Sequence, residues 1–88
     1  MTTIKRKFGR VKFWNEERGF GFLRPLIENY DGTYQIDVNE LDVFVHASRL
    51  KQTGLESLTQ NDIVSYEVSK SARTGKLEAS DVRIEAAK

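Results

Sequence analysis

The sequence contains no cysteine, which excludes a disulfide framework and a thiolate metal site. Its one histidine, His46, has no second histidine or cysteine with which to share a zinc ion, so we expect neither a metal nor a cofactor. No apolar run approaches the roughly 20 residues that span a bilayer. The segment from Met1 to Phe8 carries bases but lacks the apolar stretch of a secretory signal. These absences favour a cytoplasmic protein that does not contact membranes.

Helix signals are scarce too, because only Ser48 to Gln52 predicts a single helical turn. Short runs of β-branched and aromatic residues instead predict five strands. These strands are expected at residues 8–14, 19–23, 43–45, 63–68 and 79–84, and the only proline, Pro25, is expected to end the second. Since a chain of 88 residues supports one modest core, we predict a single all-β domain, either a small barrel or a sandwich, and five is the strand count of the OB-fold.

The formal net charge is only +1, but the charges are unevenly distributed along the chain. Residues 1–24 contain seven basic and two acidic side chains, whereas residues 25–42 contain five acidic side chains and no basic one. This separation predicts a basic zone and an acidic zone on the surface. Several basic side chains fall near predicted strand ends and turns, where they either follow a phosphate backbone or are merely solvated: Lys12, Arg18, Arg49, Lys51, Lys70, Arg73 and Lys76.

The segment Arg18-Gly19-Phe20-Gly21-Phe22 carries the strongest functional signal. Side chains alternate along a strand, so Phe20 and Phe22 share one face and offer two rings for base stacking. The flanking Arg18 suits a phosphate contact. The alternative interpretation is that both phenylalanines belong to the core.

A second pair of stacking side chains is predicted in the third strand. Alternation places Val43 and Val45 on one face of this strand and Phe44 and His46 on the other. The aliphatic side chains would face the core, which leaves Phe44 and His46 for the face that carries the other aromatic pair. The alternative for His46 is a structural hydrogen bond.

Other motifs and an enzymatic function are excluded. Gly19-Phe20-Gly21 is not a dinucleotide fingerprint, because no third glycine and no helix follow it. An RNA-recognition motif would need two helices and an aromatic residue where Pro25 stands. The acidic residues form no cluster suited to a catalytic metal, and no nucleophile has a partner base, so we do not expect an enzyme.

Three segments resemble the first strand and the two RNP-type motifs of bacterial cold-shock proteins: Val11-Lys12-Phe13-Trp14-Asn15, Arg18-Gly19-Phe20-Gly21-Phe22 and Asp42-Val43-Phe44-Val45-His46. The resemblance continues through residues 58–68 and 75–82. It implies an all-β fold, a five-stranded antiparallel OB-type β-barrel, that binds single-stranded RNA or DNA with low sequence selectivity and acts as an RNA chaperone. The nucleic-acid-binding residues that we predict are Lys12, Phe13, Trp14, Arg18, Phe20, Phe22, Phe44, His46 and Arg73.

The sequence departs from the family pattern beside the motifs. The usual order of tryptophan and phenylalanine is reversed in Phe13-Trp14, and we expect Phe13 at the stacking position with Trp14 partly exposed near the edge. Ala47 and Leu55 stand where many members carry phenylalanine, which predicts weaker binding or a shorter footprint.

Residues 24–41 form an insertion relative to the family, between the second and third predicted strands. The turn sequence Tyr30-Asp31-Gly32-Thr33 predicts a two-residue hairpin that sets Asn29 opposite Tyr34 and Ile27 opposite Ile36. We therefore predict an extended β-hairpin arm. Its acidic character disfavours phosphate, so the alternative function is a protein-interaction module that binds a protein partner or a second copy through residues 25–41. The domain is expected to span residues 8–85, preceded by a basic arm at residues 1–7.

Overall fold

The computed structural model describes residues 6–72 and 74–86, and among these it contains strands and one short helix. In chain order the elements are β1 (Lys7–Asn15), β2 (Phe20–Glu28), β3 (Tyr34–Ile36), β4 (Val43–His46), α1 (Ala47–Lys51), β5 (Ile63–Lys70) and β6 (Leu77–Ala86). The five predicted strands correspond to β1, β2, β4, β5 and β6, and the predicted helical turn to α1. Within the described ranges no helix is long and apolar enough to cross a membrane.

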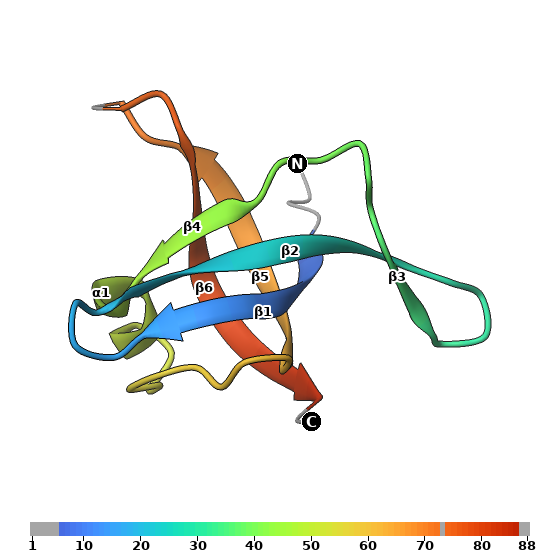
Figure 1. Cartoon of the computed structure of the whole chain (residues 1–88), viewed down its shortest axis with the longest axis horizontal. Helices are drawn as coiled ribbons and strands as arrows, with labels where there is room; N and C mark the ends of the chain where they lie inside the picture. Colours follow the sequence, from blue (N-terminus) through green and yellow to red (C-terminus); the bar gives the residue numbers. More distant parts are fainter. Residues whose placement is uncertain (1–5, 73, 87–88) are drawn as a thin grey trace, which may run out of the picture.

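Five of the strands close into a ring, in which β1 pairs with β2 and β5, β6 with β5, and β4 with β2 (Figure 1). These four pairings are antiparallel. The ring closes through a parallel contact between β4 and β6, where Phe44 lies opposite Glu78. The predicted five-stranded OB-type barrel is therefore confirmed, with one parallel pairing in an otherwise antiparallel ring.

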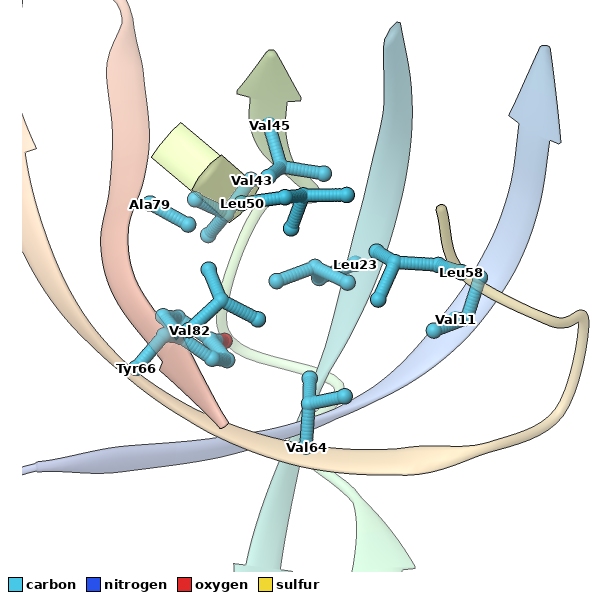
Figure 2. Packing of buried hydrophobic residues seen from close by; sticks show 10 residues of the cluster. All are labelled: Val11, Leu23, Val43, Val45, Leu50, Leu58, Val64, Tyr66, Ala79 and Val82. Atoms are coloured by element: carbon cyan, nitrogen blue, oxygen red, sulfur yellow. The ribbon is translucent and has the colours of Figure 1, made fainter. Parts of the chain in front are cut away.

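The core fills the interior of this ring with aliphatic side chains and one tyrosine (Figure 2). Val43 and Val45 point inward from β4, as their alternation predicted, and Val64 and Tyr66 are fully buried on β5. Tyr66 is fully buried, and its burial raises the pKa of the phenol. The buried cluster consists of Val11, Leu23, Val43, Val45, Leu50, Leu58, Val64, Tyr66, Ala79 and Val82.

The prediction that Pro25 ends the second strand is wrong, because β2 continues through it to Glu28. Pro25 lies opposite Gly9 of β1, and its carbonyl accepts a hydrogen bond from the Asp37 amide. In a strand the amide and the carbonyl of one residue point to the same side. The missing N–H of Pro25 therefore faces the connection between β3 and β4, where no ladder hydrogen bond is needed.

The predicted hairpin arm exists, but its register is shifted by one residue. Tyr34 lies opposite Glu28 rather than Asn29, and Ile36 lies opposite Leu26 rather than Ile27. The reason is a turn of three residues, in which the Asn29 carbonyl accepts from the Gly32 amide and Gly32 has a φ of +86°. A type I turn followed by a left-handed glycine produces this register. The shift exchanges the side chains that share a face of the arm.

The start of the described chain is anchored to the barrel. Arg6 donates to the Asp81 carboxylate at 2.7 Å and to the Ser65 hydroxyl at 3.0 Å, and Ser65 in turn donates to Glu85. Lys7 is the first residue of β1. Of the basic arm predicted at residues 1–7, residues 1–5 lie outside the described residues, and the domain boundaries stay a prediction.

Candidate nucleic-acid interface

Four phenyl rings form one continuous cluster on the outer face of the barrel. Phe20 and Phe44 are stacked, with ring centroids 5.8 Å apart and planes at 23°. Phe22 contacts the other three rings, at centroid distances of 5.5 Å to Phe13, 6.3 Å to Phe20 and 5.7 Å to Phe44. None of these rings belongs to the buried core, and Phe13 is 40% exposed. We call Phe13, Phe20, Phe22 and Phe44 the aromatic platform.

A β-bulge in β1 turns Phe13 toward this face. Val11 lies opposite Leu23 and Phe13 opposite Phe22, so two steps along β1 match one step along β2. Lys12 is the extra residue. In a regular strand Val11 and Phe13 would share a face, but the bulge lets Val11 be fully buried while Phe13 joins Phe22 outside.

Trp14 lies on the opposite face from the platform. It is half-buried and packs against the core cluster, and its indole N–H donates to Glu16 at 2.8 Å. It also lies opposite Gly21, where a Cβ atom would come within 2.8 Å of the indole Cε3. The glycine between Phe20 and Phe22 therefore makes room for the indole ring. The part that Trp14 plays in binding stays a prediction.

His46 is exposed at the end of β4, beside the platform, and it also caps α1. It lies opposite Phe20 in the β2–β4 register. Its Nδ1 accepts a hydrogen bond from the Ser48 amide at 3.1 Å, which satisfies one of the free amides at the start of the helix. Both interpretations of His46, structural and stacking, are therefore compatible with this geometry, because the cap uses one ring nitrogen and leaves the ring face free.

Lys12 and Arg24 are joined by the carboxylate of Asp42, which was not among the predicted site residues. Lys12 Nζ lies 2.8 Å from Asp42 Oδ2, and Arg24 Nη1 lies 3.2 Å from Asp42 Oδ1. The hydrogen bond from Lys12, and then the one from Arg24, hold the pKa of Asp42 below its usual range. The two cations stay at the edge of the platform, and the ionised carboxylate offsets part of their charge.

A hollow of about 270 Å³ opens beside the platform at Phe22 and Phe44, and Thr74, Lys76 and Glu78 form its other walls. A neighbouring hollow of about 300 Å³ adds the side chain of Leu41. The predicted site residue Arg73 belongs to the same β5–β6 connection but lies outside the described residues. Leu41 gave no signal in the sequence, because nothing local indicates that the end of the segment 24–41 reaches the platform.

The remaining basic residues lie in turns, in α1 and at the end of a strand. Arg18 is exposed in the turn between β1 and β2, where its amide donates to the Asn15 side chain. Arg49 and Lys51 are in the last turn of α1, where positive charge stabilises the helix end. Lys70, at the end of β5, is exposed. Lys76, by contrast, lines the same hollow as Phe22 and Phe44, and Lys12 directly precedes Phe13 in β1.

The positions where relatives were expected to carry further phenylalanines hold non-aromatic side chains. Leu55 packs against the core, and Ala47 is half-buried at the start of α1. In the described part of the chain no group of three histidine, cysteine or acidic side chains lies close enough together to hold a metal ion.

Residues 7–84 match the family model of the 'Cold-shock' DNA-binding domain. The chain belongs to the cold-shock domain family. This assignment implies binding of single-stranded nucleic acid, and the family consists of nucleic-acid-binding proteins rather than enzymes. The platform of exposed rings gives this cold-shock domain a surface of the expected kind.

Bacterial relatives support the assignment. The chain is 35% identical over 75 residues to cold shock protein CspA of Rhizobium meliloti (strain 1021), which covers 85% of this chain and 93% of the relative. It is 42% identical over 65 residues to cold shock-like protein CspC of Bacillus cereus, covering 74% and 82% of the two chains. A third relative is cold shock-like protein CspE of Buchnera aphidicola subsp. Acyrthosiphon pisum (strain APS), 36% identical over 73 residues, or 83% and 86% of the chains.

Proposed function

We propose that this protein binds unpaired RNA or DNA by stacking bases on Phe13, Phe20, Phe22 and Phe44, and that it acts as an RNA chaperone. His46 extends the stacking surface, and the cations Lys12, Arg18 and Arg73 meet phosphates. Binding would favour unpaired strands over duplexes by mass action, because the rings require exposed base faces. Weak secondary structure in a transcript would then melt as the protein binds.

The observation that carries this proposal is the separation of the four rings from the core. Each stacked base is worth about 1–3 kcal/mol, and the ring faces serve every base type. An exposed cluster of large apolar side chains also costs solubility, so a surface of this kind marks an interaction site. The basic edge adds a contribution that weakens as salt rises.

The direct test is a titration with fluorescently labelled oligo-dT, oligo-U and a duplex of matched length at two salt concentrations, followed by anisotropy. We expect both single strands to bind, the duplex to bind far more weakly, and the affinity to fall as salt rises. The comparison of oligo-U with oligo-dT ranks RNA against DNA. Equal affinity for duplex and single strand would contradict stacking.

The variant Phe13→Ala tests whether a platform ring contributes to binding, and Tyr30→Ala is the control. Tyr30 is a fully exposed ring in the turn of the arm, outside the platform. Loss of Phe13 should weaken binding by about 1–3 kcal/mol, whereas loss of Tyr30 should leave it unchanged. If the two variants lost the same affinity, the rings would act as general apolar surface and not as a platform.

A second function is favoured by the composition of the arm. The large apolar side chains exposed among the described residues concentrate in the predicted insertion: Ile27, Tyr30, Ile36, Val38 and Leu41, against Phe13 and Ile84 elsewhere. Exposed apolar side chains among acidic ones suit a protein partner or a second copy. We propose that residues 25–41 form such a contact. Sedimentation of the protein and of a Val38→Ser, Leu41→Ser variant tests self-association, which should weaken in the variant.

Two further expectations from the sequence belong to this proposal and remain predictions. One is the cytoplasmic location. The other is that residues 24–41 are an insertion relative to other cold-shock domains, which the lengths of matching segments in relatives can test.

A further inference from the structure

The outer face that carries the aromatic platform continues along β1 and β2 toward the arm. Antiparallel partners point to the same side of a sheet, and so do alternate residues of one strand. Phe22, Arg24 and Leu26 therefore share the outer face of β2, and their partners on β1 are Phe13, Arg10 and Phe8. Figure 1 shows β2 running without a break from the β4 side of the barrel to β3.

Two arginines occupy the middle of this face. Arg10 lies directly opposite Arg24, a pairing of like charges that is unfavourable without an anion between them. Arg24 is paired with Asp42, at 3.2 Å. Arg10 makes no ion pair within the described residues, and its Nε is buried without a hydrogen-bond partner. An arginine that has no carboxylate partner and lies opposite a second arginine suits an oxyanion with several acceptor oxygens, such as a phosphate.

A second aromatic group lies beyond the arginines, at the root of the arm. The rings of Phe8 and Tyr34 are in contact, with centroids 5.4 Å apart and planes at 50°. Leu26, which is 8% exposed, lies between Phe8 and Ile36 in the register of β1, β2 and β3. Leu26 is four residues from Phe22, so this group lies about 13 Å along β2 from the platform.

We infer that the nucleic-acid track of this protein is longer than the aromatic platform: one strand crosses the platform, places a phosphate at Arg10 and Arg24, and stacks a further base on Phe8 and Tyr34. This inference rests on the proposed function. It assigns Arg10, Arg24, Phe8 and Tyr34 to the same ligand, and the shifted register of the arm is what brings Tyr34 to this face. With the register expected from the sequence, Tyr34 would lie opposite Asn29, on the other side of β2.

The carboxylates of Glu28 and Glu85 define where the nucleic-acid track ends. Glu28 lies opposite Tyr34, and burial, followed by the carboxylates of Glu28 and Glu85, raises the pKa of the Tyr34 phenol. The phenol is therefore neutral and offers its ring without adding negative charge. Beyond it, further phosphates would meet carboxylates, so the strand leaves the protein at this point.

Length-dependent binding tests the inference with Tyr34→Leu and Arg10→Gln. Tyr34→Leu keeps an apolar contact with Phe8 and removes the ring face. The probes are labelled oligo-dT of about 4 and about 8 nucleotides, since single OB-type domains bind from about 4 nucleotides upward. We expect Tyr34→Leu to weaken binding of the longer strand about tenfold while the shorter strand, bound on the platform, is unaffected.

Arg10→Gln should also act only on the longer strand, and it should lower the slope of log affinity against log salt by about 0.7, the value for one single-strand phosphate contact. Arg10→Lys should retain most of that slope, and thermal melting of each variant checks that it is folded. Lys51→Gln, which removes a charge from α1, is the matched control and should change the affinity for neither oligonucleotide. Phe22→Ala should weaken both strands.

The outcomes separate this inference from the proposed function. If wild-type protein bound neither strand, the proposed function would fail, and the longer track with it. If wild-type protein bound both, and Tyr34→Leu and Arg10→Gln changed neither length dependence nor salt slope, only the longer track would be overturned. Equal losses for the two lengths would also overturn it, because they would indicate a change in the platform.

Discussion

Deletion of Lys12 should be tolerated. Removing a residue from a regular strand usually moves the side chains on one side of the deletion to the opposite face of the sheet. Lys12 is the extra residue of the bulge in β1. Without it, Phe13 directly follows Val11 and so faces the opposite side, as it does now. Val11 stays opposite Leu23 in the core, and Phe13 stays opposite Phe22 on the platform.

The expected loss of stability is small, because few contacts depend on Lys12. Its ion pair with Asp42 joins side chains that are 54% and 22% exposed, and such a pair is worth about 0.2–1 kcal/mol. Its carbonyl accepts one hydrogen bond, from Gln60 at 3.2 Å, worth about 1 kcal/mol. The deletion should therefore lower the free energy of unfolding by about 1–2 kcal/mol.

Deletion of Arg10 is the matched control, because it lies in the regular part of the same strand. Closing the gap would move Phe8 into the inward position of Gly9. A Cβ atom there would already be 2.8 Å from Cε1 of the buried Tyr66, so a phenyl ring cannot fit. The start of β1 must either detach or distort, and the loss should be at least about 3 kcal/mol.

Urea unfolding followed by the fluorescence of Trp14, the only tryptophan, measures both losses. Anisotropy with labelled oligo-dT then measures binding. The Lys12 deletion should lower the salt slope by about 0.7, for one phosphate contact, and keep the stacking contribution. The reasoning would be refuted if this deletion destabilised the protein as much as the Arg10 deletion, or weakened binding as much as Phe13→Ala.

Two further variants separate roles that share one residue. His46→Asn should keep the cap on the Ser48 amide, since asparagine is a good N-cap, while it removes the ring. We therefore expect an unchanged melting temperature and weaker binding of oligo-dT. His46→Ala removes the cap as well, so both the melting temperature and the affinity should fall. Asp42→Asn should abolish the part of the pH dependence of stability that comes from this carboxylate. Lys12 and Arg24 lower the pKa of Asp42 in the folded protein. The stabilisation is therefore fully present above the ordinary carboxyl pKa of about 4 and is lost as the pH falls through the lowered pKa. Melting temperatures of the two proteins should therefore differ at neutral pH and converge in acid, and a constant difference would contradict this assignment.

The features that could be predicted from the sequence are those set within one strand. The alternation in β4 separated Val43 and Val45 from Phe44 and His46, and the structure buries the two valines and leaves the other two side chains outside. This succeeds because the side-chain period of a strand is a local property. The number of barrel strands followed from the same patterns.

The features that could not be predicted depend on contacts between strands. Pro25 is tolerated in β2 because its missing amide points away from the partner strand β1, toward Asp37 just beyond the end of β3, and only the neighbouring connection decides this. The arm register depends on whether Gly32 belongs to a turn of two or three residues, and the sequence Asp31-Gly32 suits both. The bulge at Lys12 has no local signal, although it determines which way Phe13 points.

The arrangement of β1 makes folding and binding separable at Phe13 but not at Trp14. Val11 and Trp14 flank the bulge on the core side, so the strand is held by its inward side chains. The ring of Phe13 instead contacts the platform rings of Phe20 and Phe22. Truncating Phe13 removes a stacking surface and leaves the buried cluster intact. Truncating Trp14 would instead leave a cavity against the core beside Gly21. Weaker binding of such a variant could result either from destabilisation of the fold or from a lost contact with nucleic acid. Only variants of the outward rings can therefore measure what stacking contributes.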